Sequence, residues 1–175
     1  MIRISELLGK KSTIILLRYF LEHPTEVVHA EKLGKRIKLS RKAMFDGLHS
    51  LQEAGILDLD EIGRMKRYCL MRDTPVVRQL KILFTVDDIM PFLEGLRGSG
   101  VEVYLYGSAA RGEDTEASDI DLLIIGGVDR KKALGAIRAE KRLKPIYLTF
   151  VEYSALARKD KAFYERVEKD RIRLI

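Results

Sequence analysis

The sequence predicts an α+β protein of two domains, of which the second is a small mixed α/β domain. Apolar spacing in residues 12–71 is typical of three helices followed by a hairpin, whereas strands and helices alternate from residue 101 onward. The charge divides in the same way. Residues 1–82 hold 16 Lys and Arg against 10 Asp and Glu, a net charge of +6, and residues 83–175 hold 16 of each. A basic first half joined to a neutral second half indicates a polyanionic partner for the first.

The boundary between the domains is predicted at Asp73-Thr74-Pro75, because proline biases the preceding residue away from helix. The expected organisation is a first domain at residues 1–74, an apolar connector at 75–86 and a second domain at 87–175. A chain of 175 residues is long enough for both parts to bury a core.

Three helices are predicted in the first domain. The first covers residues 12–23, with Ser12 as its N-cap and Pro24 after its end. The second covers residues 29–39, and the third starts from Ser40 as N-cap and ends at Gly55. Apolar residues at helical spacing should face the core: Ile14, Leu17, Leu21, Ala30, Leu33, Ile37, Met44, Leu48 and Leu51.

A hairpin should follow, with strands at 56–61 and 67–71 and a turn at 63–66. The order of helix, helix-turn-helix and two-stranded wing resembles the winged-helix DNA-binding domains of bacterial and archaeal regulators, over roughly Lys11 to Met71. The segment KLSRKAMFDGLHSLQEAGIL is similar to their recognition helix and its exit. The resemblance implies double-stranded DNA as a partner. Winged helices commonly pair to read two half-sites, so we expect a homodimer.

The third helix carries polar and aromatic side chains opposite its apolar stripe, and such a face fits a major groove. Cations at the wing tip would add phosphate contacts, which supply affinity without sequence information. The residues expected to contact DNA are Ser40, Arg41, Lys42, Phe45 and His49 on the helix and Arg64, Lys66 and Arg67 on the wing. Two alternatives stay open: the module could serve dimerisation or protein contact, and Phe45 could belong to the core.

In the second domain, a helix at 86–97 is predicted to start from the capping-box-like pair Thr85 and Asp88 and to end at 98–100. Pro91 within it fits the first turn or a kink. The elements expected after it are strands at 101–106 and 119–125, a helix at 130–142 capped by Asp129 with Ala133, Leu134 and Ile137 inward, a strand at 145–151, a helix at 155–170 and a closing strand at 171–175.

The stretch GSAARGEDTEASDIDLLII, residues 107–125, joins the first two of these strands. Side chains alternate along a strand, so Asp119 and Asp121 should point to one face while Ile120 enters the core. Two neighbouring carboxylates repel each other, and a hard divalent cation such as Mg²⁺ would relieve this. Gly107 permits a tight turn, and a helical turn beginning at Ser108 would face an anion with its N–H groups.

Gly-Ser followed by ten residues and Asp-x-Asp resembles the signature of the nucleotidyltransferase superfamily that includes DNA polymerase β, and the fuller string is similar to its minimal nucleotidyltransferases. The similarity covers about Asp87 to Ile175. It implies Mg²⁺ or Mn²⁺ and a nucleoside triphosphate, with Asp119 and Asp121 as catalytic and metal ligands. The residues implied for nucleotide and phosphate are Gly107, Ser108, Arg111 and Ser118. Arg111 could equally form an ion pair that braces the loop.

Enzymes of this family use a third carboxylate, which the resemblance places inside the strand PIYLTFV near Tyr147. This chain has no acid there. The nearest acid is Glu152, which has the opposite strand parity to Tyr147 and could serve only if the strand bends or ends early.

Three functions are compatible with these features. The chain could be a DNA-binding regulator that senses Mg²⁺–nucleotide with little turnover. It could be an active transferase that moves NMP to a hydroxyl of a protein partner or small molecule, as the antitoxin role of minimal nucleotidyltransferases implies. It could also be a scaffold that dimerises through its first helices.

Composition excludes other classes of protein. Cys69 is the only cysteine, so neither a disulfide framework nor a Cys-based zinc site is expected. No signal peptide and no apolar run of membrane-spanning length is present, so we expect a cytoplasmic protein without membrane partners. Asn is absent while Lys, Arg and Glu abound, a usage typical of a thermophile.

Overall fold

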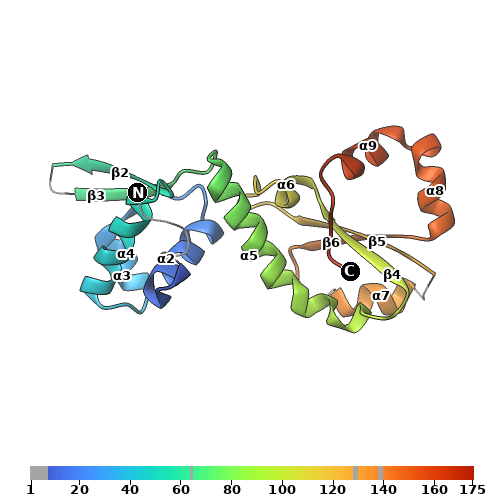
Figure 1. The fold of residues 1–175 in the computed structure, drawn as a ribbon, viewed down its shortest axis with the longest axis horizontal. Helices are drawn as coiled ribbons and strands as arrows, with labels where there is room; N and C mark the ends of the chain where they lie inside the picture. Colours follow the sequence, from blue (N-terminus) through green and yellow to red (C-terminus); the bar gives the residue numbers. More distant parts are fainter. Residues whose placement is uncertain (1–7, 64, 128–129, 138–139) are drawn as a thin grey trace. The chain divides into compact units, whose positions relative to one another are not determined.

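A computed structural model describes residues 8–63, 65–127, 130–137 and 140–175 (Figure 1). The chain divides into two compact units, Met1–Leu80 and Lys81–Ile175. Helix α5, Pro75–Leu93, runs without a break through the predicted connector and contributes residues to both units. The division at residue 80 therefore falls inside a helix.

The first unit combines three helices with a three-stranded antiparallel sheet of order β1-β3-β2. Its elements are α2 (Lys11–Glu22), β1 (Val28–His29), α3 (Ala30–Arg36), α4 (Arg41–Glu53), β2 (Leu57–Ile62) and β3 (Met65–Leu70). The strand β1 had no counterpart among the predicted elements. It is two residues long and pairs with β3 at Tyr68 and Arg67, so its length gives little periodicity to detect.

Close packing of α2 against α4 forms the centre of this unit. A Cβ added at Gly47 of α4 would lie 2.5 Å from Cδ1 of Leu16, so the glycine lets the two helices approach. The predicted stripes on α3 and α4 are buried as expected. On α2 the buried face is instead Thr13, Leu16, Leu17, Phe20 and Leu21, and Ile14 is only partly buried.

Helix α4 begins and ends as its sequence predicts. The Ser40 hydroxyl accepts a hydrogen bond from the Ala43 N–H at 3.2 Å. At the other end Gly55 adopts φ +70°, and the N–H groups of Gly55 and Ile56 donate to the carbonyls of Gln52 and Leu51. This is a Schellman motif, which requires a left-handed residue and so favours glycine.

Several details of the first unit were predicted wrongly. The helix predicted at residues 29–39 covers only Ala30–Arg36, because His29 belongs to β1 and the backbone is extended at Ile37. Ser12 is not the N-cap of α2: the helix starts one residue earlier, and Lys10 occupies the cap position without a side-chain bond. The hairpin turn is shorter than 63–66, because Met65 and Lys66 already pair with Ile62 and Glu61 in the ladder. Strand pairing up to a two-residue connection leaves no room for a four-residue turn.

The second unit contains the rest of α5 and a four-stranded mixed sheet of order β6-β5-β4-β7. A mixed sheet was expected, but the order of its strands was not predicted. Strands β4 and β5 are antiparallel, β5 and β6 are parallel, and β4 and β7 are antiparallel. Its elements after α5 are η1 (Glu94–Leu96), β4 (Val101–Tyr106), α6 (Gly107–Ala110), β5 (Ile120–Gly126), α7 (Arg130–Ile137), β6 (Leu143–Leu148), α8 (Phe150–Lys159), α9 (Lys161–Asp170) and β7 (Ile172–Arg173).

Each face of this sheet is covered by a different pair of helices (Figure 1). One face packs Val103, Leu105 and Ile124 against Ile89 and Leu93 of α5, with Ile137 of α7 in the same cluster. The other face packs Tyr104, Tyr106, Leu123 and Ile125 against Val167 of α9 and the partly buried Tyr153 of α8. The two faces of β5 are both buried because each has its own helical layer.

Several boundaries in the second unit differ from the predictions. Thr85 does not start a helix, because α5 continues through it, and Pro91 lies in the last turn of α5. The strand predicted at 145–151 ends at Leu148, where Thr149 and Glu152 form a capping box for α8. The helix predicted at 155–170 is two helices, with the Asp160 carboxylate accepting from the Phe163 N–H at 3.0 Å to start the second.

The helix predicted at 130–142 ends at Ile137, which is fully buried. The predicted cap Asp129 and the side chain of Ala133 lie outside the described residues. None of the helices in the described ranges is long and apolar enough to cross a membrane.

Candidate functional site

The site begins where β4 ends. Gly107 directly follows Tyr106 and adopts φ +74°, a conformation that other residues rarely tolerate. A Cβ built at Gly107 would lie 2.6 Å from Oδ2 of Asp121. Glycine is therefore required twice, by the backbone conformation and by the close approach of a carboxylate. The short helix α6 starts at Gly107, one residue before the expected start at Ser108. Ser108 is therefore inside the helical turn.

The two acids of the motif lie at the start of β5. Asp119 directly precedes the strand, and Asp121 is its second residue, paired with Tyr106 on β4 and Lys144 on β6. Burial raises the pKa of the Asp121 carboxyl, the charge of Asp119 raises it further, and Arg166 opposes the rise. The two carboxylates thus interact electrostatically, as expected for side chains on one face of a strand.

Two cationic side chains lie near this acidic pair, and neither was predicted from the sequence. The Nζ atom of Lys144 lies 3.7 Å from Oδ1 of Asp119, and about half of each side chain is exposed. Arg166 of α9 stabilises the ionised form of Asp121 electrostatically. Neither could be found from the motif, because their positions depend on the register of β6 and on the docking of α9.

Arg111 braces the loop that follows α6. Its Nε donates to Glu113 Oε2 at 2.8 Å, and its Nη1 donates to Asp170 Oδ2 at 3.0 Å. Arg111 was expected either to contact phosphate or to form an ion pair that braces the loop. In the structure it forms ion pairs with Glu113 and Asp170. Ser118 also has a local role, because its hydroxyl accepts from the Thr115 N–H at 2.9 Å.

A buried ion pair fixes the same loop to α5. Asp114 is 5% exposed and Lys81 is 4% exposed, and Lys81 Nζ lies 3.2 Å from Asp114 Oδ1. Arg142 approaches the other oxygen of Asp114 at 3.8 Å. Charges this deeply buried are tolerated only when they are paired, so the pair holds the loop in one position. The motif stretch includes Asp114, but the sequence alone does not indicate its partner.

A family model described as the nucleotidyltransferase domain matches residues 86–174. The chain belongs to this family. Among solved structures, the chain is similar to a candidate nucleotidyltransferase from Sulfolobus solfataricus, with 20% sequence identity and a TM-score of 0.38. The similarity covers 58% of this chain and 88% of that one. No curated protein matches the chain.

Within the nucleotidyltransferase domain, position 147 cannot add a ligand to the acidic pair. Tyr147 pairs with Ile124, and residues paired across strands share a face, so Tyr147 points to the face opposite Asp121. The side chain is 5% exposed, and its hydroxyl donates to the Gly126 carbonyl at 2.8 Å. An acid at position 147 would therefore lie on the opposite face of the sheet from Asp121.

Glu152 is engaged in the capping box of α8. Its Oε2 accepts from the N–H of Thr149 at 2.7 Å and from the Thr149 hydroxyl at 3.0 Å. The signal for this role was present in the sequence, since Thr-x-x-Glu is the capping-box pattern. Within the ranges that the structure describes, no group of three or more His, Cys, Asp and Glu side chains could hold a metal ion.

In the first unit, the residues predicted to contact DNA have several roles. The hydroxyl of Ser40 caps α4, and the Arg41 guanidinium lies 5.8 Å from the centre of the Phe45 ring. The imidazole of His49 lies 3.5 Å from Glu53, and Lys42 is exposed. Phe45 is only partly buried. The exposed side of the helix thus presents the Arg41 guanidinium beside the Phe45 ring.

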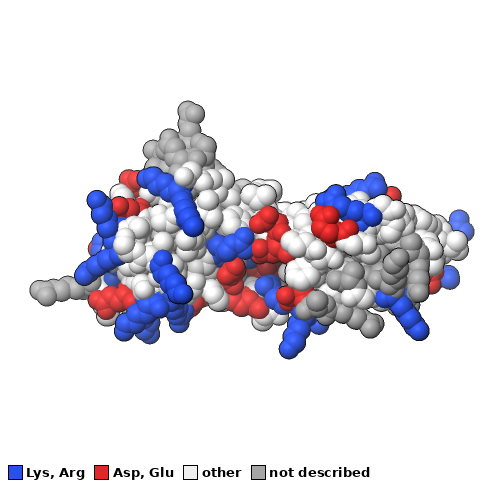
Figure 2. Space-filling view, turned by 90° about the horizontal axis from the view of Figure 1, so that it is seen from below, with Lys and Arg blue, Asp and Glu red and all other residues white. Residues whose placement is uncertain are grey.

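The predicted wing cations are paired with acids across the hairpin. Lys66 Nζ lies 3.0 Å from Glu61, and Arg67 forms an ion pair with Asp60. Arg64 lies outside the described residues. The acids of β2 therefore offset part of the charge that the wing was expected to offer to phosphates. Figure 2 nevertheless shows Lys and Arg side chains gathered over the first unit on one face.

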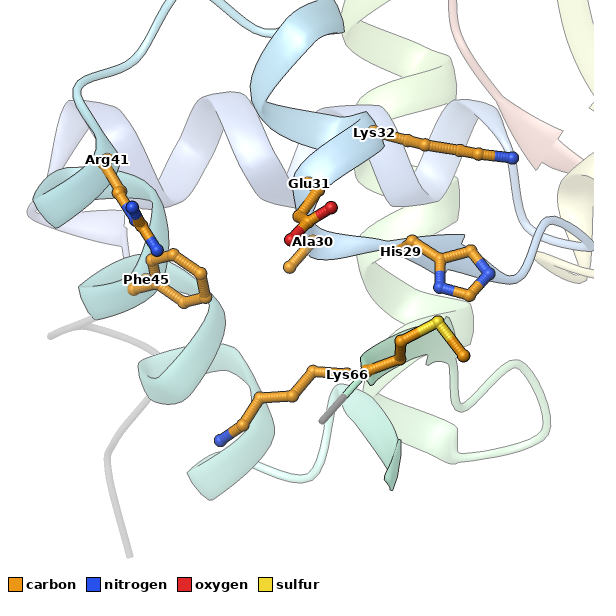
Figure 3. A pocket seen from close by; sticks show the side chains of 8 residues that line it. His29, Ala30, Glu31, Lys32, Arg41, Phe45 and Lys66 are labelled. Carbon is orange, nitrogen blue, oxygen red and sulfur yellow. The ribbon is translucent and has the colours of Figure 1, made fainter. Parts of the chain in front are cut away.

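A cavity of about 400 Å³ opens on this unit. Figure 3 shows Arg41 and Phe45 on one side of it and His29 on the other, with Lys66 along its lower edge. The residues that line it are His29, Ala30, Glu31, Lys32, Arg41, Phe45, Met65 and Lys66. The cavity therefore brings together three of the residues predicted to contact DNA.

Proposed function

We propose that this protein is a nucleotide-responsive, winged-helix DNA-binding regulator whose nucleotidyltransferase domain binds a Mg²⁺–nucleoside triphosphate. In this proposal Asp119 and Asp121 hold the cation, and Gly107 and Ser108 contact the phosphates. Ser118 and Arg111 shape the loop beside them. The observation that carries the proposal is the approach of Asp121 to Gly107, which leaves no room for a side chain between the carboxylate and the turn.

The residues present fit one divalent cation. Mg²⁺ prefers carboxylate oxygens and is usually bound by one or two carboxylates plus substrate phosphates, and Asp119 and Asp121 supply such a pair. Burial and, to a smaller extent, the charge of Asp119 raise the pKa of Asp121, and a cation bound between the two carboxylates would favour their ionised forms. Bound there, Mg²⁺ or Mn²⁺ would neutralise the acids and orient the phosphate oxygens. The two acids would position the cation, and the glycine turn lets the Asp121 carboxylate approach the backbone of the loop.

Binding of double-stranded DNA by the first unit is supported by three features. Its order of helices and hairpin resembles that of winged-helix domains, residues 1–80 hold 15 Lys and Arg against 10 Asp and Glu, a net charge of +5, and α4 presents Arg41, Lys42 and Phe45 on its outer side. Electrophoretic mobility shifts at increasing salt test this part. Affinity should fall steeply as salt rises, since phosphate neutralisation releases counter-ions.

A matched pair of variants sharpens the DNA test. Arg41→Ala and Lys42→Ala should weaken binding, while Lys161→Ala, which removes a charge from α9 in the other unit, should not. Binding that does not depend on salt, or that the α4 variants leave intact, would remove the DNA-binding half of the proposal. Addition of the preferred nucleotide with Mg²⁺ should change the affinity for DNA, and no change would leave the protein without a regulatory response.

The second candidate is an active transferase that moves NMP to a hydroxyl of a protein partner or a small molecule. Membership in the nucleotidyltransferase family favours it. A two-metal transfer needs ligands for a second cation, and the described residues offer only two acids at this place.

Incubation with Mg²⁺ or Mn²⁺, each labelled NTP and candidate acceptors separates the two functions. Label transfer that disappears in Asp119→Ala/Asp121→Ala would establish the transferase. Nucleotide binding that disappears in the same variant, without any transfer, is the result expected for the regulator. If the wild type neither binds nor transfers, the domain serves only as a scaffold.

A further inference from the structure

Lys144 occupies the position on β6 closest in register to Asp121. The two residues are paired across parallel strands, so their side chains share one face of the sheet. Lys144 Nζ also lies 3.7 Å from Oδ1 of Asp119. The position on the neighbouring strand that is paired with Asp121 is therefore occupied by a cation, whereas position 147 is on the other face.

We propose that Lys144 substitutes for a second metal ion: it neutralises Asp119 in the nucleotide-free protein and contacts the phosphates when the metal–nucleotide binds. This inference rests on the proposed nucleotide binding and concerns which positive groups neutralise the carboxylates and the phosphates at that site. It makes the site a one-metal site, with Lys144 as a phosphate-binding residue.

The balance of charge supports this arrangement. A second divalent ion would bring two positive charges, and Lys144 and Arg166 together bring the same number to the Asp pair. A lysine ammonium is a compact point charge on a flexible stem, so it can leave a carboxylate and reach a phosphate nearby. Both partners of the Lys144–Asp119 pair are about half exposed, so the pair is weak enough to be exchanged for a metal ion.

The two roles of Lys144 predict opposite effects of its removal. In Lys144→Ala, Mn²⁺ alone should bind about two- to fivefold more tightly, because a competing exposed ion pair is worth up to about 1 kcal/mol. The Mn²⁺–nucleotide complex should bind roughly tenfold more weakly, because a charge-assisted bond to phosphate is lost. A residue with a merely structural role would shift both affinities in the same direction.

Electron paramagnetic resonance of free Mn²⁺ measures both affinities on the full chain. One series contains Mn²⁺ alone, and the other contains Mn²⁺ with whichever of ATP, GTP, CTP and UTP the wild type binds best. Lys141→Ala is the matched control, since it removes the same charge from an exposed residue three positions away. Its affinities should equal those of the wild type.

Opposite shifts in Lys144→Ala, with no shift in the control, are the expected result. If the wild type binds the nucleotide but Lys144→Ala changes neither affinity, or changes both in one direction, this inference is overturned and the proposed function stands. If the wild type binds no nucleotide at all, the proposed function and this inference fall together.

Discussion

Gly107→Ala tests how the turn and the acidic pair depend on each other. The new methyl group would lie 2.6 Å from Asp121 Oδ2, far inside normal contact distance. The atom in the way is the end of a side chain, so rotation of the Asp121 carboxylate can relieve the overlap with little loss of stability. The φ of +74° adds a cost of about 1–2 kcal/mol for a residue with a Cβ. Rotation of Asp121 should weaken Mn²⁺ binding at least about tenfold.

Gly98→Ala is the matched control, because Gly98 has φ +71° and no atom within 4 Å of an added Cβ. Both variants should lose about 1–2 kcal/mol in urea unfolding. Only Gly107→Ala should lose affinity in a Mn²⁺ titration. Wild-type Mn²⁺ affinity in Gly107→Ala, or an equal loss in Gly98→Ala, would refute the reasoning that Gly107 makes room for the Asp121 carboxylate.

Three further predictions concern the surroundings of the site. Lys81→Met should lower the free energy of unfolding by about 3 kcal/mol, since the buried Asp114 loses its nearer cation and keeps Arg142, at 3.8 Å. Lys81→Met/Asp114→Leu should recover most of this loss, and an equal loss of unfolding free energy in the single and double variants, measured in urea, would contradict the prediction. Tyr147→Asp should destabilise the fold and leave Mn²⁺ affinity unchanged, and a gain in affinity would show that the residue faces Asp121 after all. Without divalent metal, stability should fall as pH rises from the ordinary Asp range through the raised pKa of Asp121, because the folded protein keeps this proton longer than the unfolded chain. Asp121→Asn should lack this decline, and an identical pH profile for wild type and variant would contradict it.

Local signals predicted much of the secondary structure. The limits of α4, from Ser40 to Gly55, follow from an N-cap and a left-handed C′ residue, which act within one turn of the chain. The strand at 101–106 was also predicted correctly. Thr85 and Thr149 illustrate the limit, because both precede an acid by three residues, yet only Thr149 caps a helix. The difference lies in the residues before each: α5 is already helical at Thr85, whereas β6 ends before Thr149.

The candidate site was only partly predictable. The sequence alone could place Asp119 and Asp121 at the start of a strand, since this depends on local periodicity. The position of Lys144 beside the acidic pair depends on which residues of β5 and β6 are paired. The sequence carries no direct signal for this register. The role of Arg111 depended on Asp170, which lies 59 residues away in the chain. Tertiary contacts of this kind are set by packing, so they follow from the structure alone.

The most direct test of the account is equilibrium binding of labelled nucleoside triphosphates to the full chain, with Mg²⁺ and with EDTA. Asp119→Asn and Asp121→Asn serve as variants that keep the size of each side chain. We predict saturable binding that requires the metal and is lost in both variants. Binding that persists in EDTA, or in either variant, would contradict the claim that these two carboxylates hold the nucleotide through a cation.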